Sequence, residues 1–374
     1  MFTTEAKATA AAWPRGGGSA LLVEDQWQIA YVKYTATTPP VQKTQVNLIF
    51  AHGAGMNKSV WKQHIQRLYE QNRDAPWHLE HVLSVDIANH GDSALLNKGK
   101  LAWGFDWRDG GRDLVLVVKH EAQSTGDLMP SPTSMNILVG HSFGGFSCTY
   151  AAHLEPTLFG GCIAVEPVLF VINELKDFFF RRLQKIDRAI LDTFDLMEQA
   201  VEYFRKRSLY RTLEPAVLKD LMEDELYEEN GKIKCKASKE AQMALYCTSM
   251  YSLDIDQEVL RLIRVLYLHI VGKDAEWNLP QTVDFVRDSI PEGLLEQKAI
   301  PGTHLMFGEH VADTVEAISL FCAARAKFSE EHRAEHPVVK YGGNRQKMMQ
   351  NMLPIIYEGN YDEAFWYARP RPKL

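Results

Sequence analysis

Short apolar runs alternate with longer amphipathic stretches along most of this 374-residue chain. The run at 45–51, QVNLIFA, is too short for a buried helix and holds β-branched and aromatic residues, so it predicts a buried strand. Because such runs alternate with helical stretches, we expect an α/β fold with a mostly parallel sheet and helices on both faces. The expected strands are 27–34, 45–51, 82–86, 135–139, 161–168, 265–272 and 296–300, and the expected helices are 60–69, 109–121, 143–153, 281–289 and 311–324.

The pattern changes after about residue 170, where long helical stretches with many charges replace the alternation. Apolar residues from Leu183 to Phe204 are spaced three and four apart, which predicts one long amphipathic helix. We interpret this part as a helical lid inserted into the core. The expected divisions are an early edge segment or mobile start at 1–18, the core at 19–169 and 257–327, the lid at 170–256, and a C-terminal extension at 328–374.

One predicted strand runs directly into a motif typical of a catalytic serine. The segment 140–144, GHSFG, reads G-x-S-x-G and follows the strand at 135–139. The two glycines leave room for a sharp turn between strand and helix, which would place the Ser142 hydroxyl above the sheet. The helix that follows would point its first amides at an oxyanion beside the serine. We therefore expect Ser142 to be a nucleophile and the Phe143 amide to bind the oxyanion.

A second glycine-rich loop, 52–56 (HGAGM), follows another predicted strand. Parallel strands end at the same edge of a sheet, so this loop is expected near the serine. Backbone amides in such a loop stabilise the negative charge that develops on a carbonyl oxygen. We expect the amide of Ala54 or Gly55 to act with that of Phe143.

A serine hydroxyl is a poor nucleophile, so it needs a histidine base, and the histidine needs a carboxylate. His304 lies on a loop after the last predicted strand and is the expected base. Two acids are open: Asp274 follows the strand after the lid, and Glu166 ends the strand after the nucleophile helix. The residue pattern does not choose between them. Asp86 and Asp92 are expected to cap and pin a turn instead.

Composition narrows the class of protein further. A formal charge of -7 and a pI near 6.0 give no general attraction to nucleic acid. The five cysteines form neither a C-x-x-C pair nor an even framework, which favours a reducing compartment. No apolar run approaches the ~18 residues of a membrane span, and no secretory signal is visible. We expect a soluble protein that needs no metal or redox cofactor.

Five motifs together resemble the α/β-hydrolase superfamily: 52–56 (HGAGM), 85–94 (VDIANHGDSA), 140–145 (GHSFGG), 165–168 (VEPV) and 302–305 (GTHL). More narrowly, they are similar to a group of fungal peroxisomal hydrolases. That group includes a yeast lipase, an acyl-CoA hydrolase of mycophenolic acid biosynthesis, and hydrolases of toxin gene clusters. The resemblance implies an α/β-hydrolase fold with an inserted lid.

The resemblance also bears on the acid and on the location. In the acyl-CoA hydrolase the acid is an aspartate on the strand after the nucleophile helix, and the matching position is Glu166, so the resemblance favours Glu166 over Asp274. The tripeptide Pro372-Lys373-Leu374 resembles the peroxisomal Ser-Lys-Leu signal, with proline in place of serine. We therefore expect the peroxisomal matrix, with the import receptor as a partner.

These features predict a serine hydrolase that cleaves an ester or acyl-CoA thioester of an apolar acyl group. A lipase or carboxylesterase and a carbon–carbon bond hydrolase remain alternatives, because the lid pocket separates these activities. A catalytically silent binding scaffold is the alternative outside enzymes. A homodimer is left open. Four basic residues of the lid are candidates to meet coenzyme A phosphates, although a solvated helix face explains them equally well: Arg181, Arg182, Lys185 and Arg188.

Overall fold

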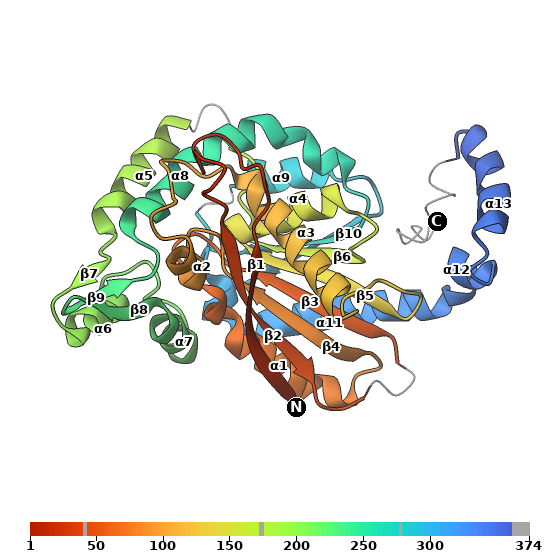
Figure 1. Cartoon of the computed structure of the whole chain (residues 1–374), viewed down its shortest axis with the longest axis horizontal. Helices are drawn as coiled ribbons and strands as arrows, with labels where there is room; N and C mark the ends of the chain where they lie inside the picture. The colour runs from red at the N-terminus through yellow and green to blue at the C-terminus, as the bar shows by residue number, and fades with distance from the viewer. Residues whose placement is uncertain (40–42, 172–175, 277–278, 361–374) are drawn as a thin grey trace.

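The computed structural model describes residues 1–39, 43–171, 176–276 and 279–360. An eight-stranded sheet runs through it in the order β1-β2-β4-β3-β5-β6-β10-β11 (Figure 1). The β1–β2 and β2–β4 pairs are antiparallel and the other neighbours are parallel, so the predicted mostly parallel sheet is confirmed. The strands are β1 (Phe2–Ala10), β2 (Gln28–Ala36), β3 (Gln45–Ala51), β4 (His78–Val85), β5 (Ser134–His141), β6 (Gly161–Val165), β10 (Leu266–Gly272) and β11 (Leu295–Ile300).

Helices cover both faces of this sheet, as predicted. Successive side chains of a strand point to opposite faces, so each face of β3 has its own apolar partners. Leu48 and Phe50 join a cluster with residues of α1 and α11, whereas Ile49 and Ala51 join a cluster with residues of α3 and α4. The helices are α1 (Lys62–Gln71), α2 (Gly91–Leu96), α3 (Trp107–Ser124), α4 (Phe143–Leu154), α5 (Lys176–Ala189), α6 (Met197–Lys206), α7 (Pro215–Glu225), α8 (Lys239–Ile255), α9 (Pro280–Ser289), α10 (Met306–Glu309), α11 (Val311–Glu331), α12 (Pro337–Lys340) and α13 (Arg345–Tyr357).

The N-terminal segment forms an edge strand. β1 pairs along its whole length with β2, from Phe2 opposite Ala36 to Ala10 opposite Gln28. Most of its residues are exposed, which is typical of an edge with one free side. Of the two expectations for residues 1–18, the edge segment is therefore the one found.

The lid segment, residues 170–256, differs from the single long helix that we predicted within it. The apolar spacing from Leu183 to Phe204 spans two helices, α5 and α6, with the short strand β7 (Thr193–Phe194) between them. β7 pairs with β9 (Lys232–Cys235), which pairs with β8 (Leu226–Glu229). The prediction of one continuous helix was wrong because backbone pairing with β9, distant in sequence, overrides the local helical spacing.

The C-terminal extension carries α12 and α13, which lead away from the body of the protein (Figure 1). The predicted targeting tripeptide, 372–374, lies outside the described residues. The division of the chain into two core parts, a lid and an extension stays a prediction. Within the described ranges, no helix is both long and apolar enough to cross a membrane.

Candidate active site

Ser142 lies in a strained turn between β5 and α4. Its backbone has φ 55° and ψ −116°, in the positive-φ region that residues with a side chain rarely adopt. The Ser142 amide donates a hydrogen bond to the Val165 carbonyl of β6 at 3.0 Å. The turn thus sits on the carboxyl edge of the sheet, where α/β proteins bind ligands.

Both glycines of the G-x-S-x-G motif are required by close backbone contacts. A β-carbon on Gly140 would lie 2.1 Å from the carbonyl oxygen of Gly144. A β-carbon on Gly144 would lie 2.3 Å from the carbonyl oxygen of Ala51, the last residue of β3. These distances are far below van der Waals contact, so a larger residue at either position would displace the turn that carries Ser142.

His304 lies between the serine and a carboxylate. Its Nε2 is 3.0 Å from Ser142 Oγ, and its Nδ1 is 3.0 Å from Glu166 Oε2. A carboxylate oxygen accepts, so Nδ1–H donates to Glu166 and leaves Nε2 to accept from the serine hydroxyl. This tautomer is the one that lets a histidine remove a proton from serine.

Glu166 is held rigidly at the end of β6. It is fully buried, and its amide donates to the Ile270 carbonyl of β10 at 2.8 Å. Its other carboxylate oxygen, Oε1, accepts from the Gly272 amide at 2.5 Å. Its backbone also has a positive φ, 47°. The extra methylene of glutamate over aspartate is accommodated, since the carboxylate contacts His304.

Asp274, the alternative acid, takes a different position. Its side chain is exposed and accepts from the Gly302 amide at 3.3 Å, and its own amide donates to the Gly302 carbonyl at 2.9 Å. The side chain of His304 contacts Glu166 and Ser142, and Asp274 contacts Gly302. Asp274 therefore braces the loop that precedes the histidine and lines the same cavity.

Two backbone amides near Ser142 are available to a ligand. Among the described residues, the amides of Ala54 and Phe143 have no hydrogen-bond acceptor, and both residues line the cavity. The Gly55 amide, the other residue that we considered, donates to His90 Nε2 at 2.8 Å. Ala54 is therefore the one of the two whose amide is free to act with that of Phe143.

Two buried histidines shape this glycine-rich loop. His52 donates from Nδ1 to the Gly53 carbonyl at 2.8 Å and accepts at Nε2 from the Ile87 amide at 3.1 Å. Burial lowers the pKa of His52 to about 3 and that of His90 well below its ordinary value, so both rings are neutral. From the sequence, both histidines were expected only to lie in turns. Their hydrogen bonds to the glycine-rich loop were not predicted.

A third histidine, His141, contacts the backbone of His304. It is buried beside Ser142, and its Nε2 donates to the carbonyl oxygen of His304 at 2.8 Å. Burial keeps its pKa well below the ordinary value, so the ring is a neutral donor and not a competing base. A β-carbon on Gly53 would lie 2.7 Å from His141 Nδ1, which explains the glycine at that position.

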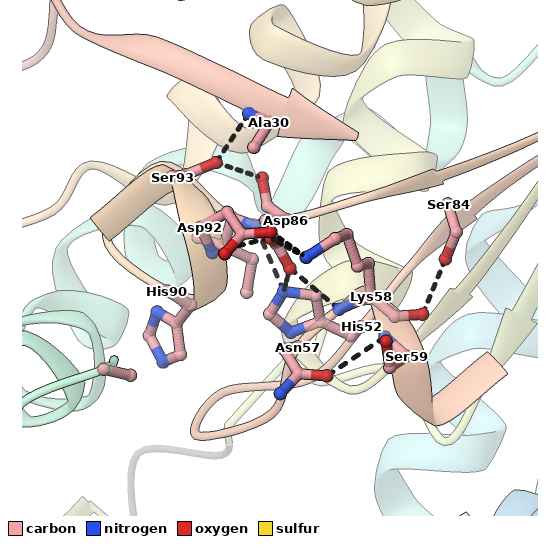
Figure 2. Close-up of polar contacts among 12 residues, drawn as sticks. Ala30, His52, Asn57, Lys58, Ser59, Ser84, Asp86, His90, Asp92 and Ser93 are labelled. Carbon is pink, nitrogen blue, oxygen red and sulfur yellow. Dashed lines mark hydrogen bonds and ion pairs between the residues drawn. The ribbon is translucent and has the colours of Figure 1, made fainter. Parts of the chain in front are cut away.

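Asp86 pins the core turn, as predicted. Figure 2 shows Lys58 and Asp92 converging on this carboxylate. Asp86 accepts from the Lys58 amide at 2.8 Å, from Lys58 Nζ at 2.9 Å and from the Asp92 amide at 2.9 Å. Asp92 was expected to cap the same turn. Its carboxylate instead accepts from Lys58 and Lys236, which lie on other segments.

This cluster also joins the lid segment to the core. Lys58 Nζ lies 2.9 Å from Asp224 of α7, and Asn57 Nδ2 donates to Glu225 of the same helix at 3.0 Å. Lys236, which follows β9, also contacts Asp224, at 2.8 Å. The residues directly after the glycine-rich loop thus anchor the lid segment. Sequence reasoning missed this link because its partners lie more than 160 positions apart.

A cavity of about 320 Å³ opens above Ser142 and His304. The lid segment supplies one wall and the core supplies the other. The lining combines apolar side chains with four charged ones, Arg182, Arg211, Asp274 and Glu276. The apolar lining residues include Met56, Trp107, Val168, Phe179, Ile186, Leu209 and Leu305. No group of three or more residues that could hold a metal ion is found in the described parts of the chain.

The sequence model of the alpha/beta hydrolase family matches residues 48–317. The chain therefore belongs to the alpha/beta hydrolase family, and the resemblance drawn from its motifs is confirmed. The solved structure of the peroxisomal α/β-hydrolase Lpx1 of Saccharomyces cerevisiae has a TM-score of 0.78 and 28% identity, over 86% of this chain and 88% of that one.

Comparison of sequences also finds Lpx1, together with acyl-CoA thioesterases. The peroxisomal membrane protein LPX1 of Saccharomyces cerevisiae is 27% identical over 342 residues, 85% of this chain and 86% of the relative. The type I acyl-CoA thioesterase mpaH of Penicillium roqueforti is 31% identical over 153 residues, and the match covers 41% of this chain and 33% of the thioesterase. The chain thus matches about a third of that thioesterase. The structure of E-2-(acetamidomethylene)succinate hydrolase, with a TM-score of 0.61 and 18% identity, shares the fold.

Glu225 is a buried titratable group among the contacts that anchor the lid segment. Its carboxyl group is buried, and burial raises its pKa from 4.5 to about 8 although Asn57 and the Ala237 amide both donate to it. A carboxyl group whose pKa is higher in the folded than in the unfolded protein stabilises the fold while it is protonated. This stabilisation is complete below the unfolded pKa and is lost as the pH rises through the folded pKa. The stability of the fold should therefore fall with pH between about pH 4.5 and about pH 8.

We predict that Glu225→Gln removes this dependence. Between pH 5.5 and 8 the free energy of unfolding of the wild type should fall relative to the variant by about 1 kcal/mol per pH unit. Urea unfolding at several pH values measures it. Glu223→Gln, at an exposed position of the same helix, is the matched control and should leave the slope unchanged. Parallel curves for wild type and Glu225→Gln would contradict the prediction.

Proposed function

We propose that this chain is a serine hydrolase that cleaves a carboxylic ester or acyl-CoA thioester of an apolar acyl group. The observation that carries the proposal is the pair of 3.0 Å contacts that link Ser142, His304 and Glu166 below an apolar cavity. This arrangement matches the nucleophile, base and acid of a hydrolytic triad. Membership of the α/β-hydrolase family supports the same reaction class.

The proposed reaction has two steps. Ser142 Oγ attacks the carbonyl carbon while His304 Nε2 takes the hydroxyl proton, and Glu166 stabilises the imidazolium. The carbon–oxygen or carbon–sulfur bond then breaks, and His304 returns the proton to the leaving alcohol or thiol. Water next attacks the acyl-enzyme with His304 again as base, which releases the acid and restores Ser142.

The amides of Ala54 and Phe143 are proposed to bind the oxyanion. Among the described residues neither amide has an acceptor, and both residues line the cavity next to Ser142. Phe143 is the first residue of α4, so the positive end of the helix dipole adds to its amide. Donors fixed in advance stabilise developing negative charge without reorganisation. His52 and His90 would act as positioning residues, because their bonds fix the loop that holds Ala54.

The substrate class follows from the cavity and from the relatives. A cavity of about 320 Å³ with many apolar side chains in its lining suits an apolar acyl chain. Partial matches to acyl-CoA thioesterases favour a thioester. The relative that matches most of the chain is peroxisomal, in agreement with the location expected from the sequence. Recognition of 372–374 by the import receptor remains a prediction.

We predict that Glu166→Gln lowers kcat/KM about a thousandfold or more, because glutamine neither fixes the correct tautomer of His304 nor stabilises its charge. Asp274→Asn is the comparison. It keeps a side-chain oxygen that can accept from the Gly302 amide, so it should lower kcat/KM far less, by about tenfold at most. Steady-state turnover of acyl-CoA thioesters and p-nitrophenyl esters checks both, with Ser142→Ala as the inactive reference. A collapse with Asp274→Asn and not with Glu166→Gln would contradict the assignment.

Arg182 is the residue of the lid segment that we propose to meet coenzyme A. Of the four basic residues considered, Arg182 lines the cavity, whereas Arg181, Lys185 and Arg188 are exposed. Its Nη1 lies 3.2 Å from the largely exposed Glu276 carboxylate. A phosphate would replace that carboxylate as partner, since guanidinium groups bind both in the same two-point manner.

Arg182→Ala should therefore raise KM for an acyl-CoA about tenfold, in line with loss of a hydrogen bond to a charged group. KM for a p-nitrophenyl ester of the same acyl chain should stay within about twofold, because that ester carries no phosphate. Arg181→Ala, which removes an equal charge at the adjacent exposed position, should change neither value. Equal effects of Arg182→Ala on both substrates would show that the residue only shapes the lid segment.

A further inference from the structure

A second cavity, of about 260 Å³, lies at the opposite edge of the sheet from Ser142. Its walls come from the start of β5, the turn after α4 and the end of α11, and α11 and β5 meet on the side from which α12 and α13 extend (Figure 1). The last residue of β5 in its lining, Asn136, lies six residues before Ser142, which is roughly 20 Å at about 3.3 Å per residue of strand. The triad makes no use of this cavity.

The charged side chains that line the cavity are those of two arginines, Arg325 and Arg333. Among the described residues that line it there is no aspartate or glutamate, and four hydroxyl side chains contribute further polar groups. Such a lining attracts anions and offers several donors to an oxygen-rich ligand. The titratable lining residues are Arg325, His332, Arg333 and His336.

Arg325 carries the strongest indication of a ligand. It is 4% exposed, its Nε donates to the Gly160 carbonyl at 2.9 Å, and its guanidinium lies 5.3 Å from the centre of the Phe328 ring. Its Nη1 is buried and has no hydrogen-bond partner in the described parts of the chain. Burial lowers its pKa only to about 10, with Glu296 acting the other way, so it is charged at neutral pH.

A buried guanidinium with an unmade hydrogen bond is unfavourable unless something binds it. Arg333 offers a second guanidinium, whose Nη2 donates to Thr44 and whose Nε is also buried without a partner among the described residues. Two guanidinium groups and several hydroxyls on one cavity match a compact anion with many acceptor oxygens. A volume below the usual range of about 300–1,000 Å³ for drug-sized ligands favours a small one.

We propose that this cavity binds a small phosphate-type oxyanion, either free or as the end group of a small phosphate ester, through Arg325 and Arg333. The site is separate from the proposed active site and does not depend on the proposed function. Phosphate suits it better than a carboxylate because its tetrahedral oxygens accept from more than one guanidinium at once.

Isothermal titration of the full chain with inorganic phosphate, at ionic strength held constant with chloride, tests the proposal. Arg325→Gln should weaken binding about tenfold or more, the loss expected for a charge-assisted hydrogen bond. Lys327→Gln removes an equal charge from an exposed position of the same helix and should bind within about twofold of wild type. A parallel titration with glycerol 3-phosphate shows whether the site prefers the free ion or the ester.

Two further samples keep the result unambiguous. If Arg325→Gln does not fold, Arg333→Gln, at a half-buried position, should weaken binding about fivefold. Phosphate could also bind at the amides next to Ser142, and a fluorophosphonate on Ser142 would occupy them. Wild type blocked in this way should still bind phosphate, because the second cavity stays open. Failure of wild type to bind phosphate, equal binding by the arginine variants, or loss of binding on blocking Ser142 would each overturn the proposal.

Discussion

The backbone of Ser142 is held in a left-handed conformation, and the geometry of the site depends on this constraint. Such a conformation costs about 1–3 kcal/mol for a residue with a side chain, so the surrounding structure must impose it. Gly144 packs directly on the Ala51 carbonyl, and the Ser142 amide bonds to Val165. The ends of β3, β5 and β6 thus fix the turn together, and they place the hydroxyl 3.0 Å from His304.

Buried charge couples the lid segment to the glycine-rich loop at 52–56. Lys58 is 5% exposed and contacts Asp86 of the core and Asp224 of α7, so its removal would leave the buried Asp86 carboxylate without this cation. The same core turn carries His90, whose ring holds the Gly55 amide. The position of the lid segment and the direction of the free amides therefore rest on one connected set of contacts.

Local pattern was enough for much of the fold and for two of the proposed catalytic residues. Ser142 and His304 were predictable because each lies in a short motif directly after a predicted strand. The acid was not, because Glu166 and Asp274 both follow strands that end at the same edge. Sheet order and one hydrogen bond from Gly272 bring Glu166 to the histidine, and neither is visible in local sequence. Long-range pairing likewise split the helix predicted in the lid segment.

The central claim is that His304 activates Ser142 as a nucleophile. Reaction with a fluorophosphonate followed by peptide mass spectrometry tests it most directly, because the reagent bonds covalently to an activated serine. The account predicts one adduct, on Ser142, in the wild type and its near-complete loss in His304→Ala. An adduct on a different serine, or equal labelling of Ser142 with and without His304, would contradict it.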